Sequence, residues 1–229
     1  MMIWSIGDLH FDHTKSKSMD IFGENWINHE KKIMESWINN VSPEDLVLVP
    51  GDISWALKLE DSIEDLKKID ELPGTKCFIK GNHDYWWGTK SKLESLGFNS
   101  INYIYNDHVE YGDYIISGTR GWYSRDSEIF TEEDEKIFVR EINRLKRSLD
   151  SYRGDMSGKK RIVMIHYPPF NCAKSPNEFL ELMIEYKVDT CVYGHLHGEG
   201  HYFAIEGNFS GVELLCVSSD YLDFKLKSI

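Results

Sequence analysis

The sequence lacks the features that mark several specialised classes of protein. It contains no Ser/Gly/Pro-rich linker, no internal repeat and no low-complexity tract, which predicts a single domain over residues 1–229. No apolar run approaches the length needed to cross a bilayer. The first residues also lack the basic segment and long apolar stretch of a signal peptide. We therefore expect a cytoplasmic protein with no membrane partner.

Cysteine is scarce, and so is clustered positive charge. None of the four cysteines is in a Cys-x-x-Cys spacing, and three lie in or near strand-like runs, which predicts buried thiols in a reducing compartment. The formal net charge of −12 argues against nucleic acid as a partner, because proteins that wrap nucleic acid usually present a basic stripe. Attraction for an anionic substrate must then come from local charge, and bound metal ions are the obvious source.

The chain does contain enough apolar residues for an ordinary core, at 41% of 229 residues. Short β-branched or apolar runs recur, and several are separated by segments with a helical spacing of apolar residues. This alternation predicts an α/β protein, with a strand-rich later part from about residue 190 and two packed sheets flanked by helices. The expected strands are 3–6, 46–49, 77–79, 114–116, 162–165, 190–193 and 214–217. The expected helical faces are Met34/Trp37/Ile38/Val41, Ile63/Leu66/Ile69 and, after a capping signal at Thr131–Asp134, Phe138/Ile142/Leu145/Leu149.

Polar side chains that can bind metals follow five of these strands. The carboxyl ends of strands form the edge of an α/β sheet at which ligands bind. Carboxylates together with several imidazoles suit Mn, Fe or Zn better than Mg or Ca. Seven ligands are too many for one tetrahedral zinc ion but fill two sites if one carboxylate bridges. The candidate ligands are Asp8, His10, Asp52, Asn82, His166, His195 and His197.

The spacing and charge of these residues fit a phosphoryl site. Asp-x-His and His-x-His place two side chains on the same side of an extended strand end. Gly7, Gly51, Gly81 and Gly194 permit sharp turns beside the ligands. Two divalent ions with two aspartates leave a net positive cluster. Each motif alone is weak, since a Gly-Asp turn or a surface His-x-His pair is common; Gly81-Asn82-His83-Asp84 is more specific, and all five occur in order.

This set of motifs resembles the calcineurin-like metallophosphoesterase superfamily, and the resemblance extends from Gly7 to His197. It implies a four-layer αββα sandwich of two mixed β-sheets flanked by helices, with a dimetal site at the C-terminal ends of the strands. It also implies roles for single residues. Asp8, His10 and His197 would bind the first metal, Asn82, His166 and His195 the second, and Asp52 would bridge them. His83 would face the phosphate and the leaving group as a catalytic residue.

The second motif departs from one branch of this superfamily. Phosphoprotein phosphatases and dinucleoside tetraphosphatases carry Gly-Asp-x-x-Asp-Arg-Gly there, whereas residues 51–57 lack that second acid, the Arg and the Gly. We therefore rank protein phosphatase activity lower. The departure also leaves His83 without its usual orienting acid, so Asp84 or another group must take that role.

Other residues have two interpretations each. Arg120, just past the strand at 114–117, could bind a substrate phosphate or form an ordinary surface ion pair. Trp55, Trp86, Trp87 and Trp122 could line a stacking wall for a base or aryl group, or simply pack in the core. His13, His29, His108 and His201 fit no motif position and are interpreted as structural or exposed.

The leading hypothesis is a hydrolase that acts on a small phosphomonoester or phosphodiester. A hydroxide between two metals, Mn or Fe and alternatively Zn, would attack phosphorus in line, and His83 would stabilise or protonate the leaving group. The alternatives are a nuclease of the same superfamily, and a metal-free scaffold such as one retromer subunit. No ligand position is missing, which disfavours the scaffold. The sequence does not predict the oligomeric state.

Overall fold

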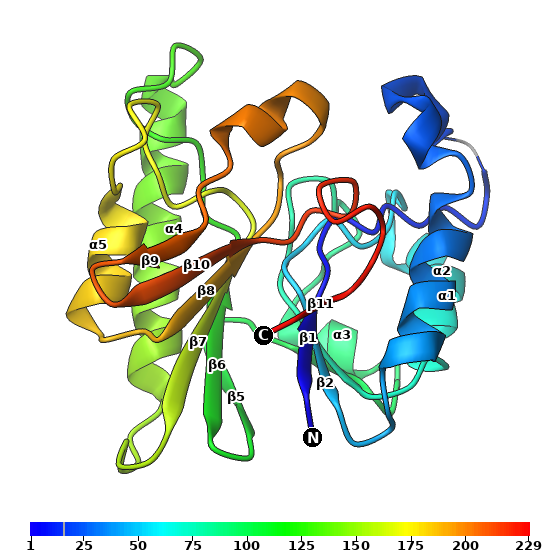
Figure 1. Cartoon of the computed structure of the whole chain (residues 1–229), viewed down its shortest axis with the longest axis horizontal. Coiled ribbons are helices and arrows are strands. Elements are labelled where there is room, and N and C mark those ends of the chain that lie inside the picture. Colours follow the sequence, from blue (N-terminus) through cyan, green and yellow to red (C-terminus); the bar gives the residue numbers. More distant parts are fainter. Residues whose placement is uncertain (16) are drawn as a thin grey trace.

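Two β-sheets packed face to face form the centre of the molecule, and helices cover their outer faces (Figure 1). The computed structural model describes residues 1–15 and 17–229. The first sheet has the order β11-β1-β2-β3-β4, in which β11 is antiparallel and the others are parallel. Its strands are β1 (Ile3–Ser5), β2 (Leu46–Val49), β3 (Thr75–Phe78), β4 (Ile101–Tyr103) and β11 (Lys227–Ser228).

The second sheet has the order β5-β6-β7-β8-β10-β9, with a parallel centre and an antiparallel strand at each edge. Its strands are β5 (His108–Tyr111), β6 (Tyr114–Thr119), β7 (Lys160–Ile165), β8 (Thr190–Tyr193), β9 (Gly207–Phe209) and β10 (Val212–Cys216). Both sheets are therefore mixed, as the family resemblance implied.

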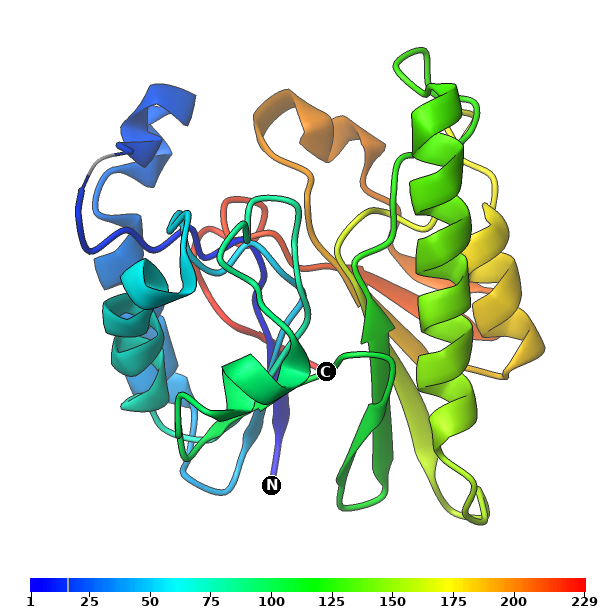
Figure 2. The ribbon, with the colours of Figure 1, turned by 180° about the vertical axis from the view of Figure 1, so that it is seen from behind.

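The helices divide between the two sheets, as Figures 1 and 2 show from opposite sides. Helices α1 (His29–Asn40) and α2 (Leu59–Asp70) cover the first sheet, and the short α3 (Lys90–Glu94) packs near β4. Helices α4 (Glu132–Ser151) and α5 (Glu178–Glu185) cover the second sheet. Three 3-10 helices, η1 (Met19–Phe22), η2 (Glu24–Trp26) and η3 (Gly198–Phe203), lie in connections. Among the described residues, no helix is both long enough and apolar enough to span a bilayer.

Alternation along buried strands builds three apolar layers between the four layers of structure. In β2, Leu46 and Leu48 pack between the sheets, whereas Val47 and Val49 pack under the helices of the first sheet. In β7, Ile162 and Met164 share the layer between the sheets, and Val163 and Ile165 face α4 and α5. Strands buried on both faces read as continuous apolar runs, which is why these two were recognisable in the sequence. The αββα sandwich expected from the sequence is confirmed.

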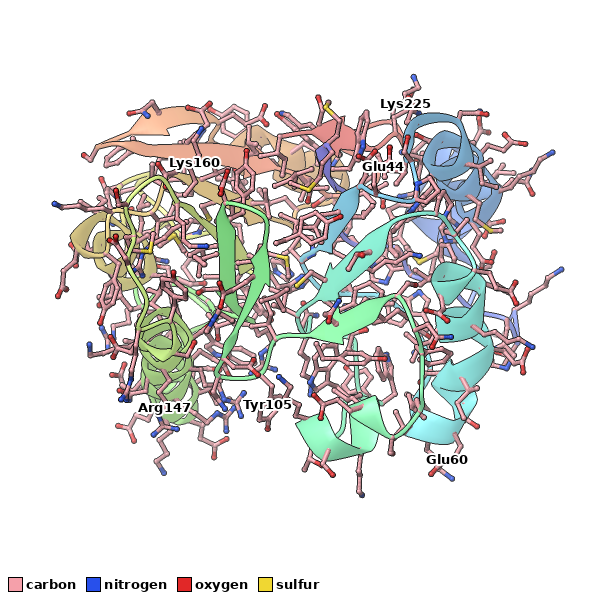
Figure 3. All side chains as sticks on the ribbon, turned by 90° about the horizontal axis from the view of Figure 1, so that it is seen from below. Glu44, Glu60, Tyr105, Arg147, Lys160 and Lys225 are labelled. Carbon is pink, nitrogen blue, oxygen red and sulfur yellow. The ribbon has the colours of Figure 1, made fainter. Side chains whose placement is uncertain are left out.

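The view from below shows the side chains that fill the space between the sheets (Figure 3). Glu60 on α2 and Arg147 on α4 lie at the periphery of that view, on opposite sides of the molecule. Three cysteines, Cys77, Cys191 and Cys216, are buried free thiols as expected, and Cys172 is exposed.

The local predictions were partly wrong at helix faces and sheet edges. Ile38 is 59% exposed, because Ile33 and Trp37 supply the buried face of α1. Ile63, at the start of α2, is also exposed. The capping box at the start of α4 is present, with Thr131 as the N-cap and Asp134 as its partner. Strands β4, β5, β9 and β11 were not predicted; they lie at or near sheet edges, where weaker apolar patterning suffices.

The two sheets meet where β1 and β10 end. The backbone N–H of Gly7 donates to the carbonyl of Val217 at 2.6 Å, and the Ser219 hydroxyl donates to the Gly7 carbonyl at 2.6 Å. These bonds hold the carboxyl ends of strands from both sheets at one edge. The loops that carry the candidate ligands leave the strands there.

Candidate metal centre

The loops after β1, β2 and β8 turn abruptly at the candidate ligands. Asp8, His10, Asp52 and His195 all have positive φ angles, of 55°, 48°, 53° and 73°. Residues other than glycine rarely adopt this left-handed conformation, and it costs free energy that surrounding contacts must offset. The concentration of such residues at one edge therefore indicates a site at which side-chain direction is fixed by the fold.

The first group of donor atoms comes from Asp8, His10 and His197. One ligand atom from each of these residues lies within 4.8 Å of the others, which is the spacing at which one ion could be shared. The Nε2 atom of His197 is 3.5 Å from the Asp8 carboxylate. These residues come from both sheets, after β1 and β8.

The second group comes from Asn82, His166 and His195. The amide oxygen of Asn82 lies 2.6 Å from Nε2 of His166 and 3.0 Å from Nδ1 of His195. One amide oxygen and two imidazole nitrogens thus converge on a point, although their residues follow three different strands.

Asp52 lies between the two groups. Its carboxylate is 3.7 Å from Nε2 of His10 in the first group and 3.5 Å from Nε2 of His166 in the second. Asp8, Asp52 and His166 also form a set of donor atoms within 4.8 Å of one another. A carboxylate that contacts both groups occupies the place required of a bridging ligand.

The electrostatics of the site fit bound cations. Burial lowers the pKa of His166 to about 4 and that of His195 to about 3, so both imidazoles are neutral, which is their metal-binding form. Burial, together with the charges of Asp84 and Asp8, raises the pKa of Asp52 well above its usual value. Burial would also raise the pKa of Asp8, but His197, together with His166 and His10, outweighs burial and lowers that pKa. A cation beside Asp52 would stabilise its charged form.

Groups behind the ligands hold two of the imidazoles in the orientation needed for binding. The Nδ1 atom of His166 is 3.0 Å from the Pro50 carbonyl, which fixes the Nδ1–H tautomer and leaves Nε2 toward the cluster. The Nδ1 atom of His197 is 2.7 Å from Asp220, and Asp220 also accepts the backbone N–H of Gly198 at 3.0 Å.

Sequence reasoning did not identify Asp220. Its carboxylate also lies 3.1 Å from Nε2 of His201, so it contacts two histidines. Burial would lower the pKa of His197. The charges and hydrogen bonds of Asp8 and Asp220 outweigh burial and raise that pKa to about 10. The available signal was position: Asp220 follows the strand predicted at 214–217, at the same edge as the other acids.

Two glycines are required by the closeness of the loops. A side chain at Gly81 would overlap the Asp52 carboxylate, and one at Gly194 would overlap the Asp8 carboxylate. The third and fifth motifs therefore need glycine for space beside the ligands, in agreement with the sequence-based expectation.

His83 lies beside the cluster, and its ring is positioned by packing. The ring centroid is 4.5 Å from that of Trp55 and 5.8 Å from that of His10. Its backbone N–H donates to Asp52 at 2.8 Å, while its buried Nδ1 has no hydrogen-bond partner among the described residues. Burial and the charge of Lys17 lower the pKa of His83.

Asp84 has a different role from orienting His83. Its carboxylate accepts the backbone N–H groups of Asp52 at 2.9 Å and Gly81 at 2.7 Å, and the Trp86 indole N–H at 3.0 Å. Asp84 therefore ties the second motif loop to the third. Trp55, which occupies the motif position of the missing acid, packs against the His83 ring.

The structure does not bring the Arg120 side chain to the cluster. Its guanidinium is 3.4 Å from Glu141 on α4 and stacks 4.3 Å from the centre of the Trp122 ring. Only its backbone carbonyl is close to a candidate ligand, since it accepts the N–H of His166 at 3.1 Å. An ion pair is therefore observed, but it is largely buried and is not the surface pair of the sequence-based interpretation.

The remaining tryptophans and histidines have separate environments. Trp86 and Trp87 are buried in the core of the first sheet, whereas Trp55 stacks on His10 with centroids 4.7 Å apart. His29 contacts the carbonyl of His10 at 3.1 Å, so it supports that loop from behind. His13 and His108 pair with other side chains outside the cluster.

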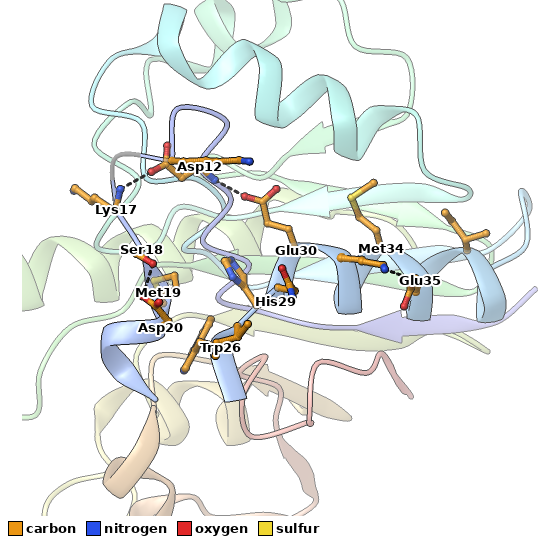
Figure 4. Close-up of a pocket in the computed structure, with 15 residues that line it drawn as sticks. Asp12, Lys17, Ser18, Met19, Asp20, Trp26, His29, Glu30, Met34 and Glu35 are labelled. Atoms are coloured by element: carbon orange, nitrogen blue, oxygen red, sulfur yellow. Dashed lines mark hydrogen bonds and ion pairs between the residues drawn. The ribbon is translucent and has the colours of Figure 1, made fainter. Parts of the chain in front are cut away.

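A cavity of about 640 Å³ lies beside the cluster, between residues 12–15 and 17–20 on one side and α1 on the other (Figure 4). It includes none of the seven candidate ligands among its described lining residues. Trp26 separates it from the cluster, with its ring 6.0 Å from that of His10 and 5.5 Å from that of His197. The Asp12 backbone N–H donates to Glu30 at 2.9 Å, which ties the cavity's loop to α1.

We expect Asp220→Asn to weaken metal binding without unfolding the protein. An amide cannot supply the negative charge that favours the correct orientation of His197, and loss of such a partner typically lowers metal affinity about 10- to 100-fold. Competition with a fluorescent chelator measures the affinity. Asp223→Asn, on the same segment but exposed, is the matched control. An unchanged affinity in Asp220→Asn would show that Asp220 does not support the ligand.

Comparison with known proteins agrees with this geometry. Residues 1–199 match the family of calcineurin-like phosphoesterases. The chain is 30% identical over 106 residues to Gene 66 protein of Mycobacterium phage D29, covering 44% of this chain and 51% of that protein. It is 24% identical over 164 residues to an uncharacterized metallophosphoesterase of Helicobacter pylori, covering 69% of this chain and 37% of that protein. The matches thus span about half or less of the length of these curated relatives.

Solved structures show the same fold at low sequence identity. Phosphopantetheinyl hydrolase of Mycobacterium tuberculosis superposes with a TM-score of 0.60 at 13% identity, covering 100% of this chain and 95% of that one. TT1561 of Thermus thermophilus superposes with a TM-score of 0.58 at 11% identity, covering 99% and 97%. On the family match over residues 1–199, the chain belongs to the calcineurin-like phosphoesterases.

Proposed function

We propose that this enzyme hydrolyses a small phosphomonoester or phosphodiester by in-line attack of water at a two-metal centre. The observation that carries the proposal is the convergence of seven donor side chains, from five loops and both sheets, on two adjoining points. Asp52 contacts a member of each group, as a bridge would. Such an arrangement uses buried charge and strained backbone that packing alone does not require.

The donor atoms also indicate which metals the site would bind. Imidazole nitrogens outnumber carboxylates in the cluster, which favours Mn, Fe or Zn over Mg or Ca. When bound, two such ions would supply an activated water and positive charge for the phosphoryl oxygens. Asp8, His10 and His197 would hold one ion, Asn82, His166 and His195 the other, and Asp52 both.

His83 is proposed to act on the leaving group. It stands beside His10 without taking part in either group of donor atoms. Its Nδ1 is buried, so Nε2 is the nitrogen proposed to face the substrate. An N–H at this place can donate to a phosphoryl or leaving oxygen. Packing against Trp55 restricts the ring to the side of the cluster on which it can do so.

A small substrate fits the charge of the protein better than a nucleic acid. The net charge of −12 would repel a polyanion over much of the surface, whereas a compact ester need only experience the local field of the cluster. The four free thiols support the cytoplasm as the proposed location.

A panel of phosphate esters tests the proposal. Aryl phosphomonoesters or phosphodiesters should be hydrolysed in the presence of Mn, and the same protein treated with chelator should be inactive. Phosphoprotein and long duplex DNA should be poor substrates. Cleavage of duplex DNA much faster than any small ester would replace this proposal with a nuclease.

Replacement of His83 separates its role from metal binding. We expect His83→Asn to keep its metal while turnover falls by about 10²- to 10⁴-fold, the usual effect of losing an acid–base group. The loss should be smaller for nitrophenyl esters, because their leaving group needs little protonation. Elemental analysis measures the metal content of the variant, and kinetics on the same preparation measures its turnover.

His108→Asn is the matched control, since His108 lies on β5 outside the cluster. Loss of metal from His83→Asn would mean that His83 is a ligand. Full activity would mean that His83 only packs beside the site.

A further inference from the structure

A second cavity, of about 270 Å³, opens beside the candidate ligand His195. It lies between the loop after β6, the loop after β7 and the segment around η3. Its lining is rich in aromatic rings and includes no acidic side chain among the described residues. The aromatic lining residues are Trp122, Tyr123, Tyr167, Phe170 and Phe203.

The wall next to His195 is held by ring contacts and a hydrogen bond. The Tyr167 ring lies 4.1 Å from the His195 ring and is only 3% exposed. Tyr123 packs against Tyr167 with centroids 4.8 Å apart, and Trp122 at 5.3 Å. The Trp122 indole N–H donates to Asp134 at 2.8 Å, which anchors this wall to the start of α4. A preformed wall of this kind binds a ligand without a large ordering cost.

The opposite side is formed by the segment around η3. Phe203 lines the cavity there and is 52% exposed, although a large apolar ring is usually covered. Lys174 contributes the one lysine or arginine of the described lining, but its ammonium group already donates to the Tyr202 carbonyl at 3.0 Å. Aromatic rings therefore lie on both sides of the space, among smaller polar and aliphatic side chains.

We propose that this cavity holds a planar aromatic group of the substrate's leaving alcohol while the phosphoryl group lies at the metal centre. The inference rests on the proposed function and names its substrate class. His195 connects the two places, since it lines the cavity on one side and lies 3.0 Å from Asn82 on the other. Aromatic walls favour flat rings through stacked and edge-on contacts, beyond what apolar area alone provides.

The cavity volume limits the size of that group. A space of about 270 Å³ accommodates one or two fused rings, but not an extended polymer. A benzylic or naphthylic group and a nucleobase share this flat aromatic chemistry. The experiment below therefore tests both an aryl group and a nucleobase.

Esters of primary alcohols with similar leaving groups separate ring recognition from leaving-group reactivity. We expect kcat/KM for 2-naphthylmethyl and benzyl phosphate to exceed that for cyclohexylmethyl and ethyl phosphate, with benzyl about tenfold above cyclohexylmethyl. Adenosine monophosphate is the nucleobase arm; a preference for it over ribose 5-phosphate would identify a base as the ring. Equal values for benzyl and cyclohexylmethyl phosphate would overturn the proposal.

Variants of the cavity provide the structural control. Phe203→Ala removes one side, and Ser127→Trp places bulk in the cavity; both should reduce the preference for aromatic over aliphatic esters several-fold. Tyr202→Ala is the matched control, because Tyr202 is an exposed neighbouring ring outside the described lining. An undiminished preference in both cavity variants would contradict the assignment.

A binding measurement decides the matter independently of turnover. Metal-free protein should bind 2-naphthylmethanol, observed by ligand NMR, more tightly than cyclohexylmethanol, and Ser127→Trp should lose this binding. Binding of the naphthyl alcohol by a protein that hydrolyses no ester would support the cavity and reject the proposed function. Hydrolysis without such binding would reject the cavity alone.

Discussion

The candidate site depends on carboxylates that are buried away from water. Asp8, Asp52 and Asp84 are all buried at one sheet edge, and buried charges are costly unless they are compensated. Asp84 is compensated by backbone and indole N–H groups, and Asp8 by His197 and the N–H of His195. Burial nevertheless raises the pKa of Asp84, and burial together with the charges of Asp84 and Asp8 raises the pKa of Asp52 well above its usual value. Cations at the two groups of donor atoms would supply the positive charge that Asp52 lacks.

The αββα architecture is what makes this concentration of charge possible. The candidate ligands follow strands of both sheets. The bonds of Gly7 to Val217 and Ser219 join the ends of β1 and β10, so loops from both sheets face one another. Left-handed backbone at Asp8, His10, Asp52 and His195 then turns each side chain across the junction. The apolar layers hold this geometry against the electrostatic cost.

The sequence was sufficient to predict two packed sheets flanked by helices and a candidate ligand cluster at the strand ends, because apolar runs and the residues that follow them are local signals. The four-layer sandwich was implied by the family resemblance. Runs such as Leu46–Val49 are apolar on both faces, and metal-binding residue types follow such runs directly. The sequence did not predict contacts between distant segments. The partner of His197 is Asp220, 23 residues away, and the ring against His83 comes from Trp55 in another loop. Ile38 fits a helical period, yet which face of α1 is covered depends on its packing against the sheet.

Elemental analysis of the purified protein tests the central claim most directly. The account predicts close to two transition-metal ions per chain in the wild-type protein. In Asp52→Asn, the binding of both ions should be weakened, because the substitution removes a negative charge next to each group of donor atoms. The opposite result, a metal content near zero after growth with Mn or Fe in a folded wild-type protein, would contradict the account.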